Sequence, residues 1–189
     1  IVIGGAAGAF PPMIGWVAAT GRLGPGAWAL AAVLLIWQIP HFLSLAWCYR
    51  EDYRKGGFRM LPVVDEPGDL TCRVVVMYCA VLLPVTLSVA LVGAAGLIYA
   101  VGAVLLGMWM LVLGVRLYRR RSQSAARRLF LASVIYLPLL MLLMLLDPAP
   151  RLVSDAATAG AAARHAVSPT DDAAGPLFLA QPESADLDV

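Results

Sequence analysis

Long uncharged apolar runs constrain this chain more than any other feature of its sequence. Five of them follow one another, each close to the roughly 20 residues that cross a hydrocarbon core of about 30 Å. They lie near residues 1–19, 27–48, 74–92, 96–115 and 129–146. A soluble protein can bury one or two such helices, but five in one chain favour bilayer spans. The sequence therefore predicts an all-α integral membrane protein, a multi-span helical bundle formed by residues 1–146.

Composition and charge agree with this prediction. Apolar residues make up 61% of the chain and charged residues 14%, against about 45–50% and about 25% in soluble domains. Basic side chains gather in two stretches that are predicted to be loops, residues 49–73 and 116–128. Two spans separate these stretches, so we expect both on one side of the membrane, which the positive-inside bias makes cytoplasmic, with the C-terminus outside. Charge interleaved with apolar runs indicates topology and headgroup contact rather than nucleic-acid binding.

The two ends of the chain differ from this pattern. Residues 147–189 carry seven acidic side chains against two arginines and are rich in Ala, Pro and Ser. Without a sustained apolar period, this segment is predicted to be a disordered acidic tail. The chain begins with Ile1 rather than Met, inside an apolar Gly-rich run. We therefore expect the native protein to have a longer N-terminal part.

The charged loop, residues 49–62 (YREDYRKGGFRMLP), holds the densest cluster of functional side chains. Its candidate residues are Arg50, Glu51, Asp52, Arg54, Lys55, Gly56, Gly57 and Arg59. Magnesium takes one or two carboxylates plus phosphate oxygens, and Arg and Lys neutralise phosphate charge, so the cluster suits a magnesium diphosphate. The two glycines would let backbone N–H groups approach an anion. Composition alone nevertheless slightly favours an ordinary cytoplasmic loop whose acids balance its cations.

His41 is the second candidate, because an ionisable side chain within a span is costly and marks a functional site by default. If one helix continues through the segment, Asp52 follows eleven residues later, which places His41 about 16 Å deeper in the membrane. Pro40 is expected to kink the helix and to open backbone carbonyls toward a cavity. The alternative is a neutral histidine that hydrogen-bonds to a neighbouring helix.

Four stretches together resemble the heme branch of the UbiA superfamily of intramembrane prenyltransferases, the protoheme IX farnesyltransferases or heme O synthases. They are GGAAGAFPPMIGW (4–16), WQIPHFLSLAW (37–47), EDYRKGGFRMLPV (51–63) and RRLFLASVIYLPLLMLLML (127–145). The resemblance covers residues 1–146. It implies a UbiA-type bundle of about nine spans around a membrane-facing central cavity, of which this chain matches the last five.

The resemblance also implies a reaction and its participants. A farnesyl group passes from farnesyl diphosphate to a vinyl group of heme b, giving heme O for heme A/O-type terminal oxidases, and Mg²⁺ assists departure of diphosphate. Heme A synthase is the protein partner this reaction suggests. Asp52 aligns with a motif that binds Mg²⁺–diphosphate, Lys55 and Arg54 would bind diphosphate oxygens, and His41 would ligate the heme iron or orient the porphyrin. Further substrate-binding candidates are Arg50, Tyr53, Gly56, Gly57 and Arg59.

Two departures from the family pattern limit this interpretation. Tyr53 stands where the wider superfamily often has a further Asp, and the first acidic motif, an Asn followed by spaced Asp residues, has no counterpart in the chain. We therefore expect the 189 residues alone to be catalytically inactive. A quinone precursor or chlorophyllide is the alternative acceptor, and a transporter or assembly subunit is the non-enzymatic alternative. A bacterial plasma membrane is favoured over the mitochondrial inner membrane.

Overall fold

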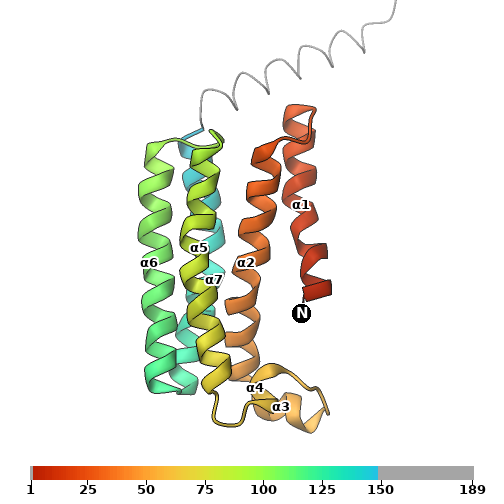
Figure 1. Cartoon of the computed structure of the whole chain (residues 1–189), viewed down its shortest axis with the longest axis vertical. Coiled ribbons are helices and arrows are strands. Elements are labelled where there is room, and N and C mark those ends of the chain that lie inside the picture. Colours follow the sequence, from red (N-terminus) through yellow and green to blue (C-terminus); the bar gives the residue numbers. More distant parts are fainter. Residues whose placement is uncertain (1, 149–189) are drawn as a thin grey trace, which may run out of the picture.

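The computed structural model describes residues 2–148, with side chains from Gly8 onward, and its regular structure is helical throughout that range (Figure 1). The helices are α1 (Val2–Thr20), α2 (Pro25–Cys48), α3 (Arg50–Lys55), α4 (Leu61–Val64), α5 (Asp69–Leu91), α6 (Leu97–Arg120) and α7 (Gln123–Leu146). The predicted all-α bundle is confirmed. Most of the predicted tail, residues 149–189, lies outside the described residues.

Each predicted span coincides with a long helix. Four of these helices, α2, α5, α6 and α7, are long and apolar enough to cross a membrane. The first predicted span corresponds to α1, which is not one of these four helices and contains Pro11 and Pro12 inside the helix rather than at its end. Proline removes a helical hydrogen bond, but neighbouring elements can satisfy the freed groups in a membrane protein. The chain is therefore built for several membrane crossings.

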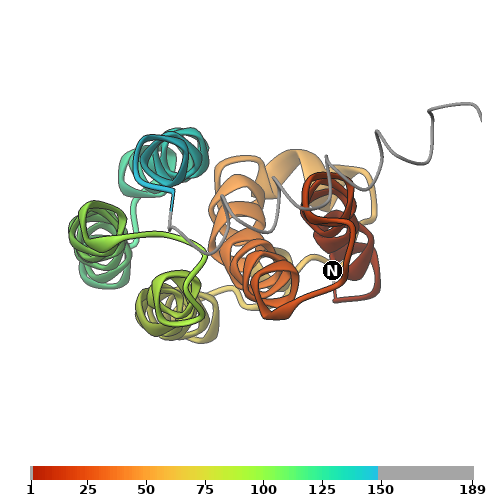
Figure 2. The ribbon, with the colours of Figure 1, turned by 90° about the horizontal axis from the view of Figure 1, so that it is seen from above.

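Helix α2 occupies the centre of the arrangement (Figure 2). On one side it packs against α1, and on the other it packs against both α5 and α7. Helix α6 completes the group by packing against α5 and α7. Because α2 contacts α1 on one side and α5 and α7 on the other, a side chain on α2 can be held by elements far away in the sequence.

Small residues bring the helices of this group close together. A side chain at Gly107 would meet the Leu83 side chain at 2.7 Å, and one at Gly114 would meet Cys79 at 3.3 Å. Close approach through small residues is the usual mode of helix association in lipid, where no hydrophobic force draws helices together. The interior is filled by large side chains that are essentially inaccessible to solvent, among them Leu82, Tyr99, Met110, Leu117, Leu129, Tyr136 and Leu140. Leucines such as Leu91 and Leu97 instead cover the outer surface, where lipid would contact them.

The second basic stretch is not the loop that the sequence predicted. Helix α6 continues through Arg116 to Arg120, and α7 already begins at Gln123, so only Arg121 and Ser122 lie between the helices. Arginine is a good helix former, so helices can extend past the hydrocarbon core into the headgroup region. An apolar run therefore marks where a span leaves lipid, not where its helix ends. Helix α5 shows the same effect, because it begins at Asp69, ahead of its predicted span.

The two basic stretches do lie at one end of the bundle, as predicted. Arg121, after α6, donates from Nη2 to Asp69 Oδ1 at 2.6 Å and from Nη1 to the Pro67 carbonyl oxygen at 3.3 Å. Figure 1 shows α3 and α4 at the same end as the α6–α7 turn. We call this the charged end.

At the opposite end, the chain after α7 returns to the start of α6. The Asp147 carbonyl oxygen accepts from the Gly96 N–H at 3.0 Å, and its Oδ2 accepts from the Tyr99 N–H at 3.0 Å. Ala95 and Pro148 form an isolated β-bridge beside these bonds. Two N–H groups at the start of α6, those of Gly96 and Tyr99, are thereby satisfied by a residue that the sequence placed in the tail.

Candidate functional site

His41 lies on α2, half-buried against α7. Its Nδ1 is 2.8 Å from Ser133 Oγ. Its ring stacks on Trp37 with centroids 4.6 Å apart and an interplanar angle of 21°, and it contacts Phe130 at 5.1 Å. These four residues, His41, Trp37, Phe130 and Ser133, form the His41 cluster. The ring is held on three sides by residues from two helices.

The hydrogen bonds of Ser133 determine which nitrogen of His41 carries the proton. The Ser133 hydroxyl donates to the Phe130 carbonyl oxygen at 2.6 Å. A serine has one hydroxyl hydrogen, so its oxygen must accept from Nδ1–H of His41. The neutral ring then carries its lone pair on Nε2, and within the described part of the chain Nε2 has no hydrogen-bond partner. A hydrogen bond from a neutral His41 to a neighbouring helix is the contact expected if His41 has only a structural role. This bond nevertheless leaves Nε2 available to a ligand.

Trp37 reinforces this arrangement one turn earlier on α2. Its Nε1–H donates to the Ser133 carbonyl oxygen at 3.0 Å. Residues 37 and 41 of α2 therefore both bind the same residue of α7, which lies 96 and 92 positions later, respectively. Pro40 lies inside α2, which continues through it to Cys48. Ser133 and Phe130 were not assigned roles from the sequence, although both belong to the stretch 127–145 that resembles the prenyltransferases.

A cavity of about 620 Å³ opens beside the His41 cluster at the charged end. Phe130 and Leu131 supply apolar surface, and Arg127 contributes a cation. Cys48, Tyr49, Gln123 and Ser124 complete its lining. The cavity lies where α2 ends and α7 begins. It therefore combines an apolar wall with one positive charge.

Helix α2 does not continue into the charged loop. It ends at Cys48, and the backbone turns at Tyr49 before α3 begins at Arg50. The helical count that placed His41 about 16 Å deeper than Asp52 assumed one continuous helix and is therefore wrong for this fold. The charged loop instead folds back beneath the bundle as α3 and α4 (Figure 1).

The charged side chains of this loop are mostly exposed. Asp52, Lys55 and Arg59 are exposed, and none of the described residues forms an ion pair with them. Arg54 is already paired, with Nη1 at 2.8 Å from Glu51 Oε1. Exposed pairs of this kind contribute about 0–1 kcal/mol, so the pair can be exchanged for a stronger anion at little cost.

The two glycines do not present N–H groups to an anion as the sequence suggested. The Gly56 N–H donates to the Asp52 carbonyl oxygen at 2.9 Å, and the Gly57 N–H donates to that of Arg54 at 3.2 Å. Both groups are consumed in ending α3. Gly57 adopts φ +72°, a conformation that glycine accepts readily. The pair therefore acts as a helix-ending turn.

Arg50 contacts residues on either side of the loop, whereas Tyr53 packs within it. The Arg50 guanidinium lies 5.6 Å from the Trp47 ring centroid, and Nη2 donates to the Glu66 carbonyl oxygen at 3.4 Å. Tyr53 packs edge-on against Phe58, an exposed residue of the same loop, with centroids 6.1 Å apart. The Arg50 contacts therefore anchor the loop, and Tyr53 does not contribute to the cavity lined by Asp52.

That second cavity, of about 370 Å³, joins the charged loop to the α6–α7 turn. Asp52, Glu51 and Arg50 face Arg121 and Gln123 across it, with Trp47, Cys48 and Tyr49 between them. Gln123 donates from Nε2 to the Cys48 carbonyl oxygen at 3.1 Å, and both residues also line the larger cavity. The two cavities therefore share a wall, and Arg121 and Gln123 are site candidates that the sequence did not reveal.

The carboxylates fit a metal ion only in part. Among residues 2–148 no group of three or more His, Cys, Asp or Glu side chains could hold one. Glu51 is engaged with Arg54, which leaves Asp52 as the exposed carboxylate of the cavity. Magnesium is commonly held by one or two carboxylates together with substrate phosphates and water. Asp52 fits as a single ligand to a magnesium ion that a diphosphate brings with it.

Comparisons with known proteins point in one direction. Residues 1–145 match the profile of the UbiA prenyltransferase family. The chain is 50% identical over 145 residues to a protoheme IX farnesyltransferase of Solibacter usitatus, covering 77% of this chain and 50% of the relative. It is 45% identical over 146 residues to the protein of that name from Salinibacter ruber, covering 77% and 52%. The chain thus spans about half the length of the curated relatives it matches. No solved structure matches it.

Proposed function

This chain belongs to the UbiA prenyltransferase family, and from that premise we propose that it serves in transferring a farnesyl group from farnesyl diphosphate to a vinyl group of heme b. The vinyl π electrons form the new carbon–carbon bond while the bond to diphosphate breaks. Water then adds to the resulting cation and loses a proton, which gives the hydroxyl of heme O. The names of the relatives support heme as the acceptor.

The observation that carries this proposal is the His41 cluster. Its imidazole has Nδ1 occupied by Ser133 and Nε2 unpaired within the described residues. Such a ring offers one nitrogen either to a metal or as a hydrogen-bond acceptor, and the partner on Nδ1 fixes its orientation. We propose that Nε2 faces the heme, where it ligates the iron or orients the porphyrin.

The neighbouring cavity suits the same acceptor. A porphyrin is flat and apolar on its faces, and aromatic walls such as Phe130 stack on flat rings. Its propionate groups are anionic, and Arg127 lies in the lining of that cavity. A guanidinium binds a carboxylate with two parallel hydrogen bonds. We propose that the heme edge with its propionates lies toward the charged end.

The charged loop is proposed to bind the donor. Asp52 would hold Mg²⁺, which when bound neutralises diphosphate charge. Lys55 and Arg54 would contact diphosphate oxygens and stabilise the charge that develops on the leaving group. Arg50 and Arg59 add positive charge to the same loop. For Gly56 and Gly57 we propose only that their turn places Lys55, since their N–H groups are already bonded.

The orientation in the membrane follows from the charges. Of the basic side chains in residues 2–148, all but Arg22 lie toward the charged end. The positive-inside bias supports a cytoplasmic location for this end. We propose a bacterial plasma membrane, with a mitochondrial inner membrane as the alternative. Heme A synthase, which would consume the product, is the proposed protein partner.

Heme extraction tests the proposal. Cells expressing the complete protein should contain heme O on chromatography, and Asp52→Asn and His41→Ala should each abolish it. Unchanged heme O in both variants would refute the site. A different prenylated product in the wild type, such as a prenylated quinone precursor or chlorophyllide, would refute heme as the acceptor.

A further inference from the structure

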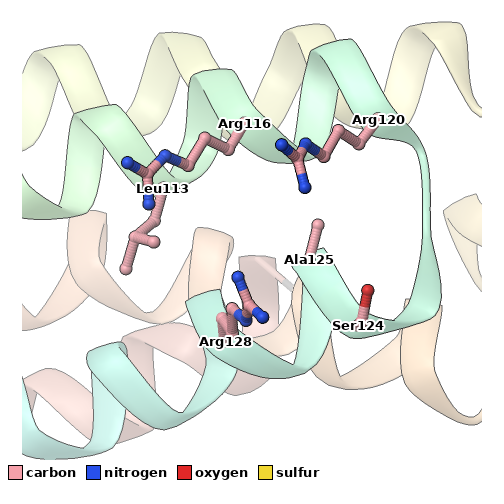
Figure 3. Close-up of a pocket in the computed structure, with 6 residues that line it drawn as sticks. All are labelled: Leu113, Arg116, Arg120, Ser124, Ala125 and Arg128. Carbon is pink, nitrogen blue, oxygen red and sulfur yellow. The ribbon is translucent and has the colours of Figure 1, made fainter.

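Three arginines that the proposed reaction does not use line a third cavity at the charged end. Arg116 and Arg120 lie one turn apart on α6, and Arg128 lies on α7. Figure 3 shows their guanidinium groups directed into the gap between the two helices. Leu113, Ser124 and Ala125 complete the lining, and the cavity has a volume of about 220 Å³. It lies on α6 and α7 and contains no residue of the charged loop.

No negative charge in the described part of the chain compensates this cavity. Its lining contains no acidic side chain. Acids nearby are engaged elsewhere: Asp69 pairs with Arg73 and Arg121, and Asp65 accepts from Thr71. The three arginines are exposed, so water weakens the repulsion between their guanidinium groups but does not remove the positive charge of the cavity. A ligand that matches this charge is an anion.

Two neighbouring arginines show that the convergence is selective. Arg119 on α6 and Arg127 on α7 are adjacent in sequence to Arg120 and Arg128, yet neither lines this cavity. Basic residues that only set membrane topology need no common direction. The same two helices therefore carry one set of arginines that converges and another that does not.

The position of the cavity indicates the kind of anion. Val112 and Met108 precede Arg116 by one and two turns of α6, and both are exposed on the surface that lipid would contact. Buried Leu113 lies at the apolar edge of the cavity. An anion bound here would thus lie where the hydrocarbon surface ends. Guanidinium groups bind phosphate oxygens with paired hydrogen bonds, and basic pockets between cytoplasmic helix ends suit lipid headgroups.

We propose that Arg116, Arg120 and Arg128 form a binding site for the phosphate group of an anionic phospholipid, with the acyl chains along α6. The Ser124 hydroxyl, which shares a hydrogen bond with the Ser122 hydroxyl at 3.2 Å, lies in the same lining, and α7 begins beside it with its positive dipole end. The same chemistry would accept a free phosphate ion, so the experiment must separate the two sources.

Two double variants provide the test, because each removes one charge from the same end of α6 and of α7. R120Q/R128Q alters the cavity, and R119Q/R127Q is the matched control. The complete protein in detergent is titrated with dioleoylphosphatidylglycerol, and binding is followed by the rise in melting temperature. Dioleoylphosphatidylcholine, alone and with inorganic phosphate, gives the neutral-lipid and free-ion arms. The melting temperature in phosphatidylcholine alone shows that each variant folds.

The expected result is affinity for phosphatidylglycerol about 30-fold lower in R120Q/R128Q, since each arginine near an anionic lipid contributes a factor of about five. R119Q/R127Q should lose much less affinity for phosphatidylglycerol. Equal losses in the two variants, or no loss in either, would overturn the site. If inorganic phosphate alone stabilises the wild type as strongly as phosphatidylglycerol, the site stands but the lipid assignment is overturned.

Discussion

The His41 cluster and the charged loop are the two parts of the proposed site, and they are built in opposite ways. In the cluster, hydrogen bonds and ring contacts between α2 and α7 hold His41 within one orientation. In the loop, Asp52, Lys55 and Arg59 project into solvent, with no ion pair from residues 2–148. The proposed acceptor side is held in place by contacts within the protein, whereas the charged side chains of the proposed donor side are not.

This difference determines which part of the proposed site loses more side-chain freedom when a ligand binds. A preorganised ring loses little freedom when its substrate binds, whereas long exposed cations lose about 0.5–1.5 kcal/mol of side-chain entropy each. A highly charged diphosphate can offset that cost through charge-assisted bonds. The comparison predicts that changes in the cluster affect stability and activity together, whereas changes of the exposed charged side chains in the loop affect activity alone.

The largest expected difference is between the two residues at the centre of each part. His41→Ala should lower the free energy of unfolding by about 2–3 kcal/mol, because it removes a half-buried ring and a hydrogen bond between helices. Asp52→Asn should change it by less than about 0.5 kcal/mol, as expected at an exposed position. Unfolding in mixed detergent micelles measures both. Similar losses of free energy of unfolding in the two variants would contradict the difference between the cluster and the loop.

Gly68 and Gly57 allow a second comparison, of the stability cost of adding a side chain at two glycines with the same backbone conformation. Both have φ +72°, but a side chain at Gly68 would overlap the Trp47 ring, whereas one at Gly57 would meet nothing within 4 Å. Gly57→Ala should cost only the left-handed conformation, about 1–2 kcal/mol. Gly68→Ala should cost about 2 kcal/mol more, because the ring must move. Equal melting temperatures would show that Trp47 does not anchor the loop.

Ser133→Ala tests the orientation of His41 with a smaller effect on stability. The free energy of unfolding should fall by about 1 kcal/mol, the typical net contribution of a hydrogen bond. Heme O formation should fall about tenfold, within the range found when a partner that orients a metal-binding histidine is removed.

The matched control is Ser88→Ala on α5. The Ser88 hydroxyl also donates to the carbonyl oxygen three residues earlier, at 2.7 Å. This variant should lose similar stability and keep its heme O formation. If Ser88→Ala and Ser133→Ala lose activity equally, Ser133 is merely structural.

The smallest effect concerns pH at the base of the loop. Burial opposes ionisation of Asp65, but hydrogen bonds from Thr71 and from backbone N–H groups outweigh it and lower its pKa below the usual 3.8. A lowered pKa means that the ionised carboxylate stabilises the fold above about pH 4 and that this contribution is lost as pH falls through the folded-state pKa. Between pH 5 and pH 3 the melting temperature should therefore fall more steeply for the wild type than for Asp65→Asn. Parallel curves would contradict this.

The long helices were predictable because runs of about 20 apolar residues favour helices that can cross a membrane, and four of them are long and apolar enough to do so. The helix ends were not, since Arg119, Arg120 and Arg127 are compatible with both helix and loop. Only contacts in three dimensions could decide between them. The break after Cys48 was missed for a related reason, because no Pro or Gly marks Tyr49 as the point where the backbone turns.

The candidate site could be proposed from its residue types, whereas the contacts between those residues could not. His41 could be singled out because an ionisable group is rare inside a span. Its orientation depends on Ser133, which is 92 positions later. Ser133 is a polar residue within an apolar run, so the sequence held a signal for it. Gln123 carried no such signal, because its bond to Cys48 follows from the packing of α7 on α2.

The contact between Asp147 and the start of α6 has a consequence for the biogenesis of the protein. The N–H groups of Gly96 and Tyr99 emerge from the ribosome about 50 residues before the aspartate that binds them. At roughly 5–20 residues per second, synthesis takes a few seconds to reach that partner. Throughout this delay the far end of α6 depends on water or the translocation machinery. This end of α6 and the last turn of α7 are therefore joined only after α7 has been synthesised completely.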